Sequence, residues 1–133
     1  MTNALVGTKL ERRVMVTPEL AIDFLGDDDT RVLATPNLIW GLEFAARDAI
    51  LPLLDPGQDS VGTQVRVDHL AATPVGMHVI FRATVLSVEG RRVNFACEAY
   101  DDVEKIAEGT HQRVVVDVGK FAERLRTKAA LVP

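Results

Sequence analysis

The chain has 133 residues and a formal net charge of −4, and 47% of its residues are hydrophobic, 26% charged and only 5% aromatic. This hydrophobic content excludes a disordered chain, and the acidic balance argues against a general nucleic-acid binder. The length fits one domain spanning residues 1–133, with a core built mainly from aliphatic side chains.

The N-terminal part of the chain predicts a strand, a short helical turn and one long helix. We expect the strand over residues 8–16 and the helical turn over residues 17–24. A polar loop then leads to Thr35 and Pro36, a hydroxyl residue followed by proline, which favours a helix start. The helix should run to the residue before Pro52, because proline cannot continue it.

This expected helix is more apolar than a surface helix. At 100° per residue, one stripe of it is formed by Leu38, Ile39, Leu42, Ala46, Ala49, Ile50 and Leu53. Trp40 and Phe44 lie outside that stripe, and we interpret Trp40 as a packing or interface residue. A helix that is apolar beyond one face is buried on more than one side, so we expect a sheet to wrap around it.

Only strands and a final helix follow. The pattern predicts strands over residues 62–70, 77–88, 91–100 and 105–118, and a terminal helix over residues 120–130. In the first of these strands Val65, Val67 and His69 alternate with charged residues and therefore share one face. Glu89–Gly90 is the expected two-residue hairpin turn, and Gly109 is a candidate bulge.

The order of these elements predicts the fold class. One strand, one long helix and four strands joined by short connections give a mostly antiparallel sheet with the helix on one face, which is a two-layer α+β arrangement. A sheet wrapped around a long apolar helix describes the hotdog fold. A single unit of this kind leaves a sheet edge uncovered, so we expect at least a homodimer.

Two polar residues interrupt the apolar faces. Glu43 lies at the edge of the helix stripe, where partial desolvation makes a carboxylate a stronger base and suits it to general-base catalysis. The alternative is an ion pair with Arg47, four residues further along the helix. His69 lies on the inward strand face and could shuttle protons near neutral pH; the alternative is a core histidine bonded to a backbone carbonyl.

Thr35 has two readings at the start of the helix. As an N-cap its hydroxyl would accept a hydrogen bond from a backbone N–H. Alternatively it is a nucleophile, or it positions a water, at a helix N-terminus whose backbone N–H groups polarise a carbonyl oxygen. The sequence leaves both readings open.

The cysteine and histidine content indicates the compartment and argues against a metal site. Cys97 is the single cysteine and cannot form an internal disulfide, so a reducing cytoplasm is the expected location and a buried apolar role the expected one. The three histidines have no metal-ligand spacing, so we expect no metal. We also expect no membrane partner, because no apolar run could span a bilayer and the N-terminus lacks the features of a signal peptide.

The candidate residues lie in stretches that resemble one family across nearly the whole chain. In order these are VLAT (32–35), GLE (41–43), GT (62–63), HLAATPVG (69–76), SVEGRR (87–92) and GTHQR (109–113). Together they resemble the fluoroacetyl-CoA thioesterases, a branch of the hotdog thioesterases. The block from residue 62 to residue 76 is the most specific part of the match.

The resemblance implies an activity and a site. It implies hydrolysis of an acyl-CoA thioester, with Thr35, Glu43 and His69 as the catalytic set. It also implies that Gly62 helps to place the thioester carbonyl and that Arg113 lies near the site. No cofactor is expected, because CoA is part of the substrate. The alternatives are a non-catalytic module that binds acyl-CoA or another small ligand, and a hotdog enoyl-CoA hydratase or dehydratase.

Two details refine this expectation. Thr35 and Glu43 are eight residues apart, about 12 Å along a helix axis, which is too far for a direct hydrogen bond. We therefore expect a composite site in which Glu43 from one subunit meets Thr35 and His69 from the other. The fluoroacetyl-specific enzyme has a phenylalanine-bearing lid before the helix, whereas residues 27–31 here are acidic and carry no phenylalanine. A broader short-chain acyl-CoA substrate is therefore expected.

Overall fold

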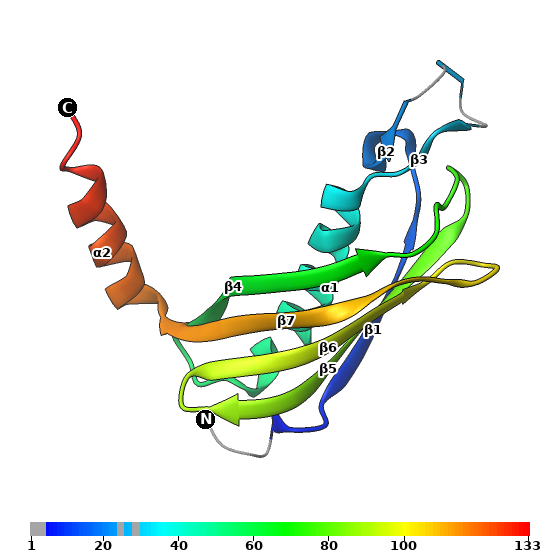
Figure 1. The fold of residues 1–133 in the computed structure, drawn as a ribbon. Helices are drawn as coiled ribbons and strands as arrows, with labels where there is room; N and C mark the ends of the chain where they lie inside the picture. Colours follow the sequence, from blue (N-terminus) through cyan, green and yellow to red (C-terminus); the bar gives the residue numbers. More distant parts are fainter. Residues whose placement is uncertain (1–4, 24–25, 28–29) are drawn as a thin grey trace.

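A computed structural model of the protein describes residues 5–23, 26–27 and 30–133. Its main sheet contains β1 (Lys9–Met15), β4 (Gln58–His69), β5 (His78–Glu89), β6 (Arg92–Tyr100) and β7 (Lys105–Asp117). The strand order is β1-β5-β6-β7-β4, and every neighbouring pair is antiparallel. The long helix α1 (Thr35–Ile50) crosses one face of this curved sheet (Figure 1). The predicted two-layer α+β arrangement is confirmed.

The helix α1 packs on the sheet through one apolar stripe. Its buried residues are Leu38, Leu42, Ala45, Ala46, Ala49 and Ile50. The predicted stripe is therefore right except at its flank and its end, because Ile39 is half-buried and Leu53 is 55% exposed. Leu53 lies in the 3-10 turn η4 (Leu51–Leu53), where Pro52 ends the α-helix and the chain turns away from the stripe.

The second apolar side of α1 is not covered within one chain. Trp40 is 64% exposed and stacks at a tilt on Phe44, with the two ring centroids 5.4 Å apart. The expectation that the sheet buries the helix on more than one side is therefore wrong for the single chain. An exposed tryptophan on a central helix is the kind of surface that a second protein chain covers.

The segment before α1 differs from the predicted helical turn. A 3-10 turn, η2 (Pro18–Leu20), is followed at once by β2 (Ala21–Ile22), which pairs antiparallel with β3 (Val32–Leu33). This two-residue ladder is too short to show an alternating pattern in the sequence. The end of the predicted turn at Phe24, and residues 28 and 29 of the acidic loop, lie outside the described residues.

Two turn and bulge details were also predicted wrongly. The hairpin between β5 and β6 turns at Gly90 and Arg91, since Glu89 still pairs with Arg92, and Gly90 has a φ of +62°. Gly109 pairs in register with Val67 and is not a bulge. A side chain there would collide with the backbone of β4, so Gly109 permits a close approach of two strands.

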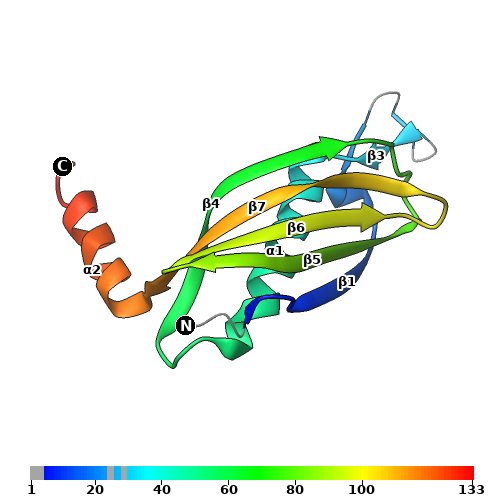
Figure 2. The ribbon, with the colours of Figure 1, turned by 60° about the horizontal axis from the view of Figure 1, so that its bottom comes forward.

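The C-terminal helix α2 (Val118–Ala129) extends away from the sheet (Figures 1 and 2). Its residues are mostly exposed, with Leu125 at 54%. The strand β4 forms one edge of the sheet, because it pairs with β7 and is the last strand in the order (Figure 2). Among the described residues, no helix is both long enough and apolar enough to cross a membrane.

Candidate active site

The start of α1 brings Thr35 against the last residue of β4. The Oγ1 atom of Thr35 lies 2.8 Å from Nδ1 of His69. Ala34 is the N-cap of the helix, and Thr35 is its first helical residue, with no side-chain capping bond at this end. The N-cap reading of Thr35 is therefore wrong: one position further into the helix, its hydroxyl is directed to the imidazole.

His69 has one nitrogen engaged and one free. Its Nε2 atom is buried and has no hydrogen-bond partner among the described residues. Burial disfavours the imidazolium and lowers the pKa of His69, outweighing the opposite effect of the backbone at Ala71. His69 is therefore a neutral imidazole at neutral pH, held by a hydroxyl, and not the fully satisfied core histidine of the alternative reading.

Glu43 lies two helical turns after Thr35. Its ion-pair partner is Arg113, and not Arg47 as in the alternative interpretation of the sequence. Its Oε2 atom is 3.5 Å from Nη1 of Arg113, and its side chain is 41% exposed. Arg47 makes no ion pair with Glu43; it forms a two-point contact with Asp59 instead, at 3.0 and 2.6 Å. The carboxylate of Glu43 is thus half-exposed and faces a buried cation.

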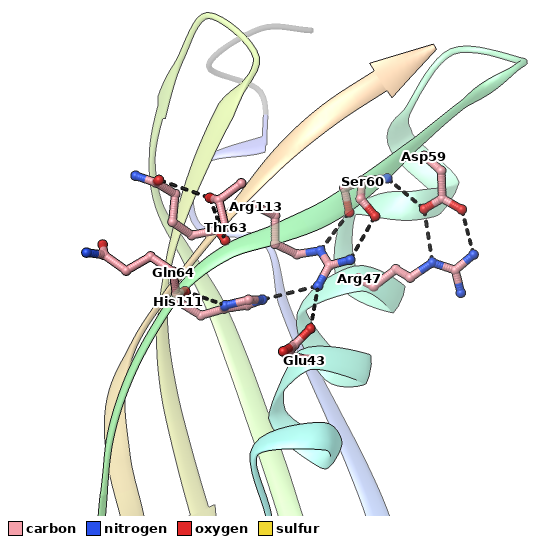
Figure 3. A network of polar contacts seen from close by, with 9 residues as sticks. Glu43, Arg47, Asp59, Ser60, Thr63, Gln64, His111 and Arg113 are labelled. Atoms are coloured by element: carbon pink, nitrogen blue, oxygen red, sulfur yellow. Dashed lines mark hydrogen bonds and ion pairs between the residues drawn. The ribbon is translucent and has the colours of Figure 1, made fainter. Parts of the chain in front are cut away.

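Arg113 is buried at 4% exposure and bonded through all three of its nitrogens (Figure 3). Its Nε donates to Oγ of Ser60 at 2.7 Å, and its Nη2 donates to the Ser60 carbonyl at 2.8 Å. Its Nη1 lies 3.2 Å from Nε2 of His111, besides the contact with Glu43. Burial lowers the pKa of Arg113, although a guanidinium remains charged at any ordinary pH.

Gly62 of β4 lies beside the Glu43 carboxylate. A Cβ atom at position 62 would be 3.0 Å from Oε2 of Glu43 and 3.1 Å from Cε1 of His111. The absence of a side chain therefore allows the carboxylate and the ring to approach the strand. Gly62 and Arg113 face each other in the β4–β7 register, so the two residues predicted to line the site are neighbours.

The predicted site residues thus form two clusters. The first, which we call the hydroxyl–imidazole pair, consists of Thr35 and His69. The second, the carboxylate cluster, brings Glu43 together with Gly62 and Arg113. Within the part of the chain that the structure describes, no hydrogen bond or ion pair joins the two clusters. The predicted separation of Thr35 and Glu43 along the helix is therefore seen in the single chain.

Sequence reasoning missed two members of the carboxylate cluster. Ser60 precedes the strand that was expected to begin at residue 62, and β4 in fact starts at Gln58. His111 entered the sequence analysis only as part of the stretch GTHQR (109–113), two residues before Arg113. The spacing of two residues between His111 and Arg113 could have revealed this neighbourhood, because it places both side chains on the same face of the strand, the face toward Glu43.

Two hollows adjoin the clusters. A cavity of about 330 Å³ between α1 and β1 has a mainly apolar lining that includes Leu33 and Asn37, which flank Thr35 in the chain. A smaller hollow of about 220 Å³ is lined by Glu43, Arg47 and Arg113. Trp40 and Phe44 line both hollows, so the two spaces share these aromatic side chains of α1.

Comparison with known proteins identifies the family. A sequence model of the fluoroacetyl-CoA-specific thioesterases matches residues 16–119. The chain belongs to this family. It is 42% identical over 97 residues to the fluoroacetyl-CoA thioesterase of Streptantibioticus cattleyicolor, covering 73% of this chain and 70% of that protein. The predicted class of enzyme, a thioester hydrolase, is thereby confirmed.

Solved structures of this family and superfamily have the same fold. A variant of the fluoroacetyl-CoA thioesterase in complex with acetyl-CoA is 34% identical, with a TM-score of 0.85 over 96% of this chain and 98% of that one. A hot-dog-like protein from Thermanaerovibrio acidaminovorans is 26% identical, with a TM-score of 0.82 over 95% of each chain. These similarities confirm the predicted hotdog fold for this thioesterase.

Proposed function

We propose that this thioesterase hydrolyses short-chain acyl-CoA thioesters, including substituted acetyl groups, to the free acid and CoA. The observation that carries the proposal is the 2.8 Å contact between Oγ1 of Thr35 and Nδ1 of His69 at the N-terminus of a helix. A hydroxyl beside an imidazole is the arrangement that acyl transfer requires. The similarity to a protein solved with acetyl-CoA supports the substrate class.

The proposed reaction adds the elements of water across the thioester bond. If Thr35 attacks the carbonyl carbon, His69 takes up the proton of its hydroxyl. If Thr35 instead holds the water that attacks, His69 orients the hydroxyl of Thr35. Backbone N–H groups at the start of α1 stabilise the negative charge that develops on the carbonyl oxygen. The C–S bond then breaks, and the thiolate of CoA leaves and is protonated. Where Thr35 is the nucleophile, the acyl group remains as an ester on its oxygen until a water molecule hydrolyses that ester to the free acid and restores the hydroxyl. No cofactor other than the CoA of the substrate takes part.

Glu43 is the proposed general base for the water. Arg113 lies 3.5 Å from its carboxylate and holds the charge in place. Because Glu43 lies about 12 Å along α1 from Thr35, we propose that the partner subunit of a homodimer supplies it. The border position of β4 in the sheet and the exposure of Trp40 support a second copy of the chain on this side.

The acyl group is proposed to be small but not restricted to fluoroacetyl. The cavity of about 330 Å³ next to α1 is lined by Val16, Leu20 and Leu33 among other residues, and it suits an apolar acyl chain better than a charged one. Asp27 and Thr30, described residues of the loop before α1, supply no aromatic side chain there.

The test is release of CoA from a panel of acyl-CoAs of increasing length, read with a thiol reagent. Burial raises the pKa of the Cys97 thiol to about 12, so the folded protein itself contributes no signal. We expect turnover to be highest for acetyl-sized and substituted acetyl groups. Saturable binding without CoA release would indicate a binding module, and hydration of an enoyl-CoA would indicate a hydratase.

A second measurement separates the two roles of Thr35. If the hydroxyl is the nucleophile, a rapid quench with slow substrates traps an acyl group on the peptide that contains Thr35. If Thr35 holds a water, no such adduct accumulates with any substrate.

A further inference from the structure

The Arg113 guanidinium is held at all three of its nitrogens. Ser60 binds Nε and Nη2 through its hydroxyl and its carbonyl. The third nitrogen, Nη1, lies between Nε2 of His111 at 3.2 Å and Oε2 of Glu43 at 3.5 Å (Figure 3). Rotation of the guanidinium about its stem would change the contact with the Glu43 carboxylate, and His111 opposes this rotation together with the two bonds to Ser60.

The hydrogen-bond pattern fixes the protonation of His111. Arginine nitrogens only donate, so Nε2 of His111 must accept from Arg113. The other ring nitrogen, Nδ1, lies 2.8 Å from the carbonyl oxygen of Gln64, which only accepts, so Nδ1 carries the hydrogen. The contacts of His111 with Arg113 and with Gln64 thus require the same state of the ring, a neutral imidazole with its hydrogen on Nδ1.

An irregularity of β4 makes the Gln64 carbonyl available. The register between β4 and β7 shifts between Gly62 and Gln64, so Thr63 is an extra residue in the strand. A bulge of this kind disrupts the ladder locally and turns backbone groups away from their usual partners. The carbonyl of Gln64 contacts Nδ1 of His111 instead, and Gly62 leaves room for the adjacent ring atom, Cε1.

The surroundings of His111 keep it uncharged. The charged groups that face it are Arg113 on its own strand and Glu43 on α1, while β4 contributes the Gln64 carbonyl and β6 contributes Phe95, whose ring stacks at 5.9 Å. Burial is the largest cause and lowers the pKa of His111; the Gln64 carbonyl opposes it, and Arg113 and Glu43 have smaller effects that lower and raise the pKa. The ring is a permanent acceptor and does not exchange protons with substrate.

We propose that His111 is a positioning residue of the thioesterase reaction, holding Nη1 of Arg113 against the carboxylate of Glu43. The inference rests on the proposed function, in which Glu43 is the general base. It assigns to a buried histidine a role that needs no proton transfer: the neutral ring provides the acceptor for Nη1 of Arg113.

Two substitutions of similar size separate this role from simple packing. His111→Gln places an amide oxygen near the position of Nε2 and can still accept from Arg113. His111→Asn reaches only the position of Nδ1, so it can bond to Gln64 but not to Arg113. Since a displacement of about 1 Å can lower a rate by about 10²-fold, we expect His111→Asn to lower kcat about 10-fold or more and His111→Gln by less than about 3-fold. KM should change little in either variant.

The outcomes of this experiment are distinct. Both variants are compared at a temperature where their thermal unfolding curves show folded protein. Equal kcat values for the two variants, whether high or low, or a loss confined to KM, would overturn the positioning role. A protein that releases no CoA from any acyl-CoA, before any substitution, contradicts the proposed function and not this inference.

A second measurement does not depend on activity. Long-range proton–nitrogen NMR spectra of the unmodified protein report the state of each imidazole. We expect the His111 ring to be neutral with its hydrogen on Nδ1 at neutral pH. A protonated ring, or a hydrogen on Nε2, would contradict the proposed contact with Arg113.

Discussion

The two polar clusters along α1 are built in opposite ways. In the hydroxyl–imidazole pair, one contact joins Thr35 to His69, and Nε2 of His69 is buried without a partner among the described residues. In the carboxylate cluster, every nitrogen of Arg113 is bonded. A buried polar atom without a partner marks a place where a ligand can bind, whereas a satisfied network marks a fixed orientation. We interpret the hydroxyl–imidazole pair as the part of the site that reacts with substrate, and the carboxylate cluster as the part that orients Glu43.

The largest effect is expected at Glu43. Glu43→Gln keeps the shape of the side chain and removes the base, so kcat should fall by about 10²-fold or more while KM changes little. The measurement is steady-state release of CoA. Glu11→Gln is the matched control, because Glu11 is a surface carboxylate paired with Arg82. Equal activity in the two variants would mean that the carboxylate cluster takes no part in the reaction.

The next effect tests the hydroxyl–imidazole pair. Thr35→Ala removes the hydroxyl that contacts His69 and should lower kcat by about 10- to 10²-fold, since the attacking oxygen or its holder is lost. Thr35→Ser keeps the hydroxyl and should keep most of the activity. If serine and alanine variants lose activity equally, the methyl group of Thr35 matters more than its hydroxyl, and our interpretation of this cluster is wrong.

A smaller effect is expected at Gly62. In Gly62→Ala the new Cβ would stand 3.0 Å from Oε2 of Glu43 and 3.1 Å from the His111 ring, so the carboxylate must move. We expect kcat to fall about 10-fold. Gly119→Ala is the control, because nothing lies within 4 Å of a Cβ at that position. A Gly62→Ala enzyme with full activity would show that the carboxylate tolerates displacement.

The smallest effect concerns stability and pH. Burial lowers the pKa of both His69 and His111 in the folded protein, so the unfolded chain binds more protons below the ordinary histidine value of about 6.5. Stability should therefore fall as the pH is lowered from about 7.5 to about 5.5. Urea unfolding midpoints measure this, and His111→Gln should reduce the loss. A midpoint that rises on acidification would contradict the assigned neutral rings.

The helices and strands that the sequence predicted well are those in which apolar residues recur at a regular spacing over several turns or residue pairs. The apolar repeat of α1 and the alternation around Val65 and Val67 survive folding because the packing of the sheet on the helix selects those patterns. The N-terminal end of the helix could not be assigned to a residue from the pattern, since the change from Thr35 to Ala34 as N-cap depends on a backbone angle. Gly109 was misread for a related reason, because a glycine in a strand indicates either a bulge or a close approach.

The candidate site was predictable in part. Glu43 and His69 stand out as polar residues on apolar faces and Thr35 as a hydroxyl residue at a helix start, and the family resemblance named the three together. Ser60 and His111 carry no such signal. The contact of Ser60 with Arg113 joins residues 53 positions apart, and it exists only through the register of β4 and β7. Contacts that depend on strand register and on a bulge have no local signature in the sequence.

The most direct test of the account is complementation between subunits. Thr35→Ala and Glu43→Gln chains, each with a different tag, are produced together and the mixed dimers compared with either variant alone. If Glu43 from one subunit serves Thr35 and His69 of the other, each mixed dimer has one intact site, and a random mixture recovers about a quarter of the unmodified activity. A mixture no more active than the separate variants would place all three residues in one subunit and contradict the composite site.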